Sequence, residues 1–124
     1  MIVFYEMQIA GLTRRLPLCP ISDTLYIAGF VIFGDYELTV ACASELLKRA
    51  PEHDVIITAE SKGIPLAYEM ARQAKEAKHI VARKEPKLYM HDVFTTQVHS
   101  ITTNAVQTLC LTATTQSSCR ASAF

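Results

Sequence analysis

The cysteines and histidines of this sequence are few, and their spacing excludes several kinds of site. No two cysteines form a Cys-x-x-Cys pair, and no two of the four histidines stand at the spacing of metal ligands on a helix. This pattern argues against a zinc site, a dithiol redox centre and a hydrolase triad. We therefore expect no metal site made of protein ligands, and buried or incidental thiols at Cys19, Cys42, Cys110 and Cys119.

The chain also lacks net charge and long apolar runs. Twelve Lys and Arg balance twelve Asp and Glu, so there is no general basic field of the kind that nucleic-acid binders use. No apolar run approaches the roughly 20 residues that span a bilayer, and the first residues lack the basic start of a secretory signal. We expect one cytoplasmic domain with no nucleic-acid or membrane partner.

The most informative stretch covers residues 54–88. Residues 55–58 form a short apolar run typical of a strand buried on both faces of a parallel sheet, and residues 80–82 form a second one. Between them Pro65 opens a predicted helix that continues to about Ala77 with an apolar stripe on one face. A right-handed crossover then predicts that the two strands lie side by side and parallel.

Basic side chains follow both predicted strands. Because ligands bind beyond the carboxyl ends of parallel strands, where helix N-termini present free amides, we expect an anion site there. Only two carboxylates, Glu60 and Glu85, oppose the four cations Lys62, Arg83, Lys84 and Lys87. Lys84 is as well explained by a solvated strand end as by direct contact with the anion.

Three stretches of this chain together resemble the type I phosphoribosyltransferases, and among them the adenine and xanthine enzymes. They read DVIITAESKGIPL at 54–66, VARKEPKL at 81–88, and VHSITT at 98–103 followed by VQTL at 106–109. The resemblance implies transfer of ribose 5-phosphate from phosphoribosyl pyrophosphate to a purine base, as in purine salvage. It also implies magnesium held through pyrophosphate, and a homo-oligomer, in particular a dimer.

The resemblance assigns a role to several residues but identifies no catalytic one. His99, Ser100 and Thr102 would belong to a mobile loop that closes over the sugar, although an ordinary hairpin explains them equally well. Glu60 could orient a ribose hydroxyl or a magnesium-bound water, or only form a salt bridge with Lys62. The predicted pyrophosphate-binding residues are Glu60, Ser61, Lys62, Gly63, Arg83 and Lys87.

The fold implied by the resemblance is α/β, a partial doubly wound parallel sheet with an N-terminal hood and a β-hairpin. Residues 1–34 would form the hood-like segment, 35–111 the core and 112–124 an atypical tail. We expect a strand over residues 2–9, a turn at 11–15, and no regular structure at 16–21 because of Pro17 and Pro20. Residues 25–33 would be a buried strand or a short helical piece, with Tyr26 and Phe30 in the core or over the purine.

Two further elements complete the prediction. Asp35 is a good N-cap for a helix that would bury Leu38, Cys42 and Leu46 and end at Pro51. Runs rich in β-forming residues at 93–101 and 106–111 predict a hairpin.

One motif of the family is missing. No two acidic residues are adjacent anywhere in the chain, whereas the family binds the sugar phosphate after such a pair. Beyond Leu111 the sequence turns small and polar, which suggests truncation or a lost reading frame, or else a natural linker. We therefore expect an inactive chain. The alternatives are a non-catalytic module that binds pyrophosphate, and a structural fragment that oligomerises through the free edge of residues 55–58.

Overall fold

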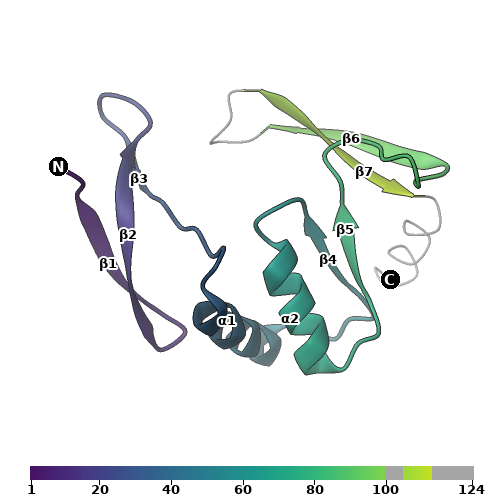
Figure 1. Ribbon diagram of the computed structural model, residues 1–124, viewed down its shortest axis with the longest axis horizontal. Helices are drawn as coiled ribbons and strands as arrows, with labels where there is room; N and C mark the ends of the chain where they lie inside the picture. The colour runs from purple at the N-terminus through teal and green to yellow at the C-terminus, as the bar shows by residue number, and fades with distance from the viewer. Residues whose placement is uncertain (100–104, 113–124) are drawn as a thin grey trace.

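The protein has an α/β fold. The computed structural model describes residues 1–99 and 105–112, and within them two helices and three small sheets are arranged in an open, bent layout (Figure 1). The first sheet lies apart from the rest and is connected through the first helix.

The N-terminal sheet has the strand order β1-β2-β3, all antiparallel, from β1 (Phe4–Ile9), β2 (Leu12–Pro20) and β3 (Tyr26–Ala28). A two-residue turn at Ala10 and Gly11, both with positive φ, connects β1 to β2 in the way that type I′ hairpins require. The expected turn at residues 11–15 and the irregular segment at 16–21 were therefore wrong, because β2 runs through both.

Pro17 is compatible with β2 because of where it stands in the ladder. The N–H of Leu18 donates to Val3 O at 2.8 Å, so the neighbouring pair of Phe4 and Pro17 makes no hydrogen bond between β1 and β2. The nitrogen of Pro17 faces away from β1, toward the side of β3, and β3 ends before it reaches Pro17. The carbonyl of Pro17 accepts a hydrogen bond from Gly29 N at 2.7 Å. Pro20 is the last residue of the strand.

Helix α1 (Tyr36–Arg49) begins and ends as predicted. The side chain of Asp35 accepts from Leu38 N at 3.0 Å, and Ala50 caps the other end before Pro51. The predicted buried face was partly wrong, since Leu46 is 44 % exposed. The face of α1 that packs on α2 buries a neighbouring stripe, formed by Leu38, Thr39 and Ala43.

The predicted parallel pair is confirmed. Strands β4 (Ile56–Ala59) and β5 (His79–Ala82) are parallel neighbours, and helix α2 (Ile64–Ala74) crosses between them (Figure 1). The helix ends three residues before the predicted Ala77 because Lys75 takes a left-handed conformation, φ 58°, and caps it. Ile57 is 49 % exposed, so β4 is covered on one face by the described residues and not on both as expected.

The predicted hairpin is confirmed as well, from β6 (Val93–His99) and β7 (Val106–Thr112). It is connected to β5 by one antiparallel bridge, in which Arg83 and Cys110 exchange two backbone hydrogen bonds of 2.9 and 2.7 Å. The parallel part of the fold is a pair of strands, and a wider doubly wound sheet is not found among the described residues.

The core is small for a chain of this length. The chain exposes 9107 Å², whereas a compact monomer of 13.8 kDa exposes roughly 6,600 Å². Tyr26 and Phe30, which we expected in the core or over a purine, are 60 % and 43 % exposed. The buried apolar side chains of the described part are Leu16, Ile32, Leu38, Ala43, Ala67, Ala71, Ala82 and Cys110.

The helices described for residues 1–99 and 105–112 are too short or too polar to cross a bilayer.

Candidate functional site

The turn after β4 contains four of the six predicted pyrophosphate-binding residues. It runs from Glu60 to Gly63, and the N–H of Ile64 donates to Ser61 O at 3.2 Å as α2 begins. The Glu60–Ser61 peptide bond is cis. Gly63 lies directly over Thr58, and a Cβ at position 63 would collide with the Thr58 hydroxyl. Close packing against Thr58 therefore favours glycine at position 63. The backbone conformation does not require glycine, because the φ of −78° at this position suits any residue.

Glu60 connects this turn to the end of β5. Its backbone N–H donates to Ala82 O at 2.9 Å, and its carboxylate accepts from Lys84 N at 2.9 Å. The guanidinium of Arg83 forms an ion pair with the same carboxylate at 3.1 Å, and both side chains are partly buried. The Lys84 N–H, and after it Arg83, hold the pKa of Glu60 below its usual value, so this carboxylate stays ionised.

Arg83 is held from several sides. One guanidinium nitrogen donates to the hydroxyl of Tyr89 at 2.6 Å, and the backbone of Arg83 bonds to Cys110 of the hairpin. The Nε atom is buried and has no hydrogen-bond partner among the described residues. The hydrogen bond to Glu60 raises the pKa of Arg83, so the guanidinium remains charged at any accessible pH. Arg83 is therefore a fixed positive charge at the junction of the two loops and the hairpin.

Lys87 contributes a second cation from the same loop. Its ammonium group forms an ion pair with Glu85 at 2.7 Å, and this contact lowers the pKa of Glu85. Lys87 is also close enough to Glu60 to help lower the pKa of that carboxylate. Within the described part of the chain, Lys62 and Lys84 have no ion-pair partner. We call residues 59–63 together with 83–87 the strand-end mouth.

The predicted site is thus partly assembled. Glu60, Arg83 and Lys87 come together, and Ser61, Lys62 and Gly63 form the adjoining turn. Glu60 pairs with Arg83 and not with Lys62. Sequence reasoning missed Tyr89. The register of the strands, with Ala59 opposite Ala82, places Glu60 beside Arg83.

Of the predicted mobile loop, only His99 lies among the described residues. His99 is exposed and ends β6, four residues beyond Thr95, which stands opposite Cys110. At about 3.3 Å per residue it is some 13 Å along the strand from the bridge to Arg83. Ser100 and Thr102 lie outside the described residues.

The hood-like segment lies over a different cleft. A cleft of about 570 Å³ separates the β1–β2 turn and residues 30–32 from α1 and α2. None of the predicted pyrophosphate-binding residues lines it. The lining residues are Ile9, Ala10, Gly11, Phe30, Ile32, Cys42, Glu45, Leu46, Arg49 and Leu66.

The magnesium that the resemblance implies would be held through bound phosphates. No group of three or more His, Cys, Asp or Glu suited to a metal occurs in residues 1–99 and 105–112. Both oxygens of Glu60 are engaged, one with Arg83 and one with Lys84 N. Glu60 therefore does not fit the role of orienting a magnesium-bound water in this arrangement. Magnesium commonly binds through substrate phosphates with few protein ligands.

No known protein family and no curated protein matches this chain. The similarity to the phosphoribosyltransferases therefore depends on its three sequence motifs alone.

Proposed function

We propose that this chain binds pyrophosphate, free or as the leaving group of phosphoribosyl pyrophosphate, at the strand-end mouth. The observation that carries the proposal is the bridge made by Glu60, which draws the β4 turn and the β5 loop together. Through this bridge Arg83 and Lys87 lie near the turn that carries Lys62. Four cations of the mouth face two carboxylates, so the mouth carries an excess of two positive charges.

The mouth offers suitable groups for a diphosphate. Lys62 and Lys84 are without an ion-pair partner among the described residues, and the N-terminus of α2 has no side-chain cap and no acidic residue in its first turn. A helix N-terminus of this kind favours a phosphate. An incoming anion would compete with Glu60 for Arg83 and with Glu85 for Lys87. We expect the affinity to be modest and strongly salt-dependent.

The wider proposal is a domain of the purine phosphoribosyltransferase kind that works in purine salvage in the cytoplasm. In such a domain β4, α2 and β5 would be part of a doubly wound sheet. The mouth would stabilise the charge that develops on the leaving pyrophosphate. The sugar phosphate needs backbone amides, and the ribose hydroxyls need paired carboxylates, but no adjacent acidic pair occurs in the sequence. We expect the 124 residues to bind pyrophosphate without transferring ribose.

The competing proposal is a module that binds pyrophosphate or a nucleotide and has no catalytic role. It is favoured by the engagement of both Glu60 oxygens, since this carboxylate then serves structure and not a reacting sugar. The two proposals share one site and differ in turnover.

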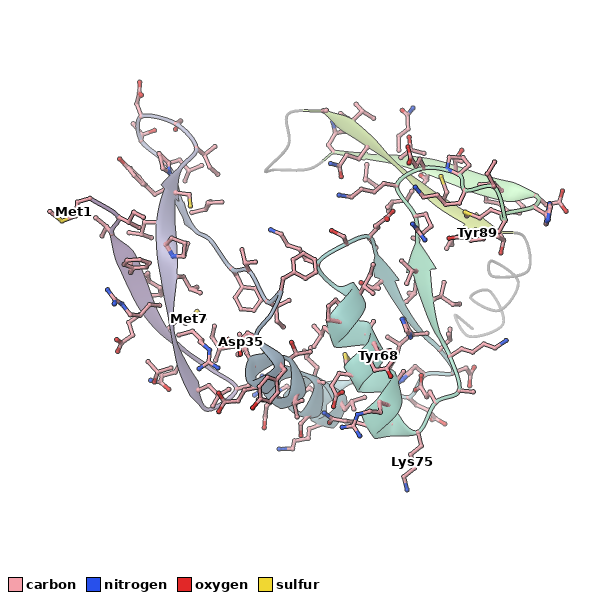
Figure 2. The ribbon with its side chains drawn as sticks, viewed as in Figure 1. Met1, Met7, Asp35, Tyr68, Lys75 and Tyr89 are labelled. Carbon is pink, nitrogen blue, oxygen red and sulfur yellow. The ribbon has the colours of Figure 1, made fainter. Side chains whose placement is uncertain are left out.

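Binding is tested by calorimetry with pyrophosphate, with and without magnesium. Arg83→Ala and Lys87→Ala should each weaken binding by about tenfold, as expected for a charge-assisted contact. Lys75→Ala is the matched control, because Lys75 lies at the opposite end of α2 (Figure 2). Unchanged affinity in both mouth variants would exclude this site.

Turnover is tested spectrophotometrically with phosphoribosyl pyrophosphate, magnesium and each of adenine, hypoxanthine, guanine and xanthine. We expect none, because losing the sugar clamp forfeits positioning that can lower a barrier by roughly 7–11 kcal/mol. A rate near one per second, within the ordinary range of enzymes, would show that these residues hold a complete site.

A further inference from the structure

Strand β1 is an edge strand whose outer side has no partner among the described residues. It pairs with β2 only, and Figure 1 shows it at the outside of the N-terminal sheet. Because Val3 accepts from Leu18 N, alternate residues face β2, and the N–H and C=O groups of Phe4, Glu6 and Gln8 face outward. Three residues therefore offer donors and acceptors in one row.

This edge lacks the protection that edge strands usually have. Natural edges are blunted by charges, prolines or bulges, whereas β1 has one charged residue, Glu6, and a regular ladder. Apolar side chains beside it are open to solvent, with Ile2 at 69 %, Val3 at 57 %, Tyr5 at 55 % and Met7 at 43 %. An edge with this composition is typical of a strand that pairs with another chain.

The charges of Glu6 and Arg15 indicate which chain would pair with this edge. Glu6 stands opposite Arg15 in the ladder, but the two form no ion pair among the described residues. The guanidinium of Arg15 lies instead over the ring of Phe4, 4.5 Å from its centre. Among the described residues Glu6 is therefore a carboxylate without an ion-pair partner, and Arg15, opposite it on β2, is a cation without a carboxylate partner.

We propose that β1 pairs antiparallel with β1 of a second copy of this chain. In such a pair the outward-facing backbone groups of one copy must lie opposite those of the other. Pairing Phe4 of one copy with Glu6 of the second copy meets this condition, and the twofold axis then passes through Tyr5. In this register the Glu6 carboxylate of one copy lies beside the Phe4 ring of the other copy. That ring is covered by Arg15 of its own copy, so Glu6 of one copy lies near Arg15 of the other. A shift by one step toward the C-terminal end of β1 would place the two Glu6 side chains opposite each other, which is unfavourable.

The product is a continuous sheet in the order β3-β2-β1-β1-β2-β3. The surface that this interface would cover is the open edge of β1 with its exposed apolar side chains. A standard interface buries about 800 Å² per partner. This surface differs from the strand-end mouth and from the free edge of β4, and it does not depend on pyrophosphate binding.

Analytical ultracentrifugation over a concentration series tests the proposal on the full chain. We expect a dimer, and we expect Glu6→Pro to raise its dissociation constant about tenfold or more, because it removes an outward donor from each copy. Thr13→Pro is the matched control, since the N–H of Thr13 faces away from β1 and its loss should leave the dimer intact. A monomeric wild-type chain, or equal dissociation constants for the two proline variants, would overturn the proposal.

A charge exchange tests the register without disturbing the backbone. Glu6→Arg and Arg15→Glu should each weaken the dimer by several fold, and the double variant should recover most of the loss. Hydrogen exchange should show the amides of Phe4, Glu6 and Gln8 protected at high concentration and exchanging freely at low concentration. Additive charge effects, or unprotected amides in the dimer, would refute this pairing.

Discussion

Replacing Gly63 by alanine should change the free energy of unfolding in opposite directions depending on residue 58. In the wild-type chain the new methyl group would meet the hydroxyl of Thr58, and the turn or the threonine must move. When Thr58 is alanine, the nearest remaining atoms are its Cβ at 3.4 Å and Ala59 O at 3.9 Å, both ordinary contacts.

Two opposing effects set the size of the change. Overpacking at a close contact costs roughly 1–3 kcal/mol. The substitution also removes conformational freedom from the unfolded chain, which stabilises by about 0.4–1 kcal/mol where the backbone suits alanine, as φ −78° does here. Gly63→Ala should therefore destabilise the wild-type chain by up to about 2.6 kcal/mol. The same change should stabilise the Thr58→Ala chain by a few tenths of a kcal/mol or more.

Urea denaturation of the four chains of this double-mutant cycle measures both values. We expect a coupling energy of about 1–3 kcal/mol between the two positions. Circular dichroism of each variant controls for loss of the helix. Additive effects, within about 0.5 kcal/mol, would show that the side chain of Thr58 does not limit position 63 and would refute the argument.

Three other predictions concern stability. Leu38→Ala, at a side chain 2 % exposed, should cost about 2–5 kcal/mol in urea denaturation, and a loss below 1 kcal/mol would contradict its place in the core. Asp35→Ala should lower the melting temperature, because it removes the cap of α1, and an unchanged value would mean that the cap contributes nothing. The hydrogen bond from His53 to Pro51 O, and after it the one to Glu76, raise the pKa of His53 above 6.5 in the folded chain. The charged His53 therefore stabilises the fold fully below pH 6.5, and this contribution is lost as the pH rises through the pKa of the folded state. The stability difference between wild type and His53→Gln should accordingly shrink between pH 6 and 9, and a constant difference would exclude the charged histidine.

The elements that sequence reasoning predicted well are those specified by local signals. Asp35 marks the start of α1 by its capping side chain, and the apolar runs of β4 and β5 with a helix between them specify a parallel pair. The sequence did not predict β2 through residues 16–20, because Pro17 and Pro20 argued against a strand there. Whether proline disrupts a strand depends on whether its nitrogen faces a neighbouring strand. The side that the nitrogen faces is decided by pairing with β1 and β3, which no local pattern around Pro17 contains.

The candidate site shows the same division. The cations of the mouth follow strand ends and could be placed together from topology alone. The partner of Glu60 could not be chosen from sequence distance, since Lys62 is two residues away and Arg83 is 23 residues away. The parallel register decides for Arg83. Tyr89 contacts Arg83 through a loop without regular structure, and no periodic signal marks it.

The strand connections have a consequence for the speed of folding. The hairpins β1–β2 and β6–β7 join neighbours in the sequence, and such hairpins form within about 1–10 μs. The pair β4–β5 cannot form until α2 and its connections close a long loop, and non-local pairing of this kind is slow. The hairpins should therefore be present in the early chain, each with an open edge, while the only parallel ladder of the described residues is still absent. The interval before β4 and β5 meet is the time during which the chain is most exposed to aggregation.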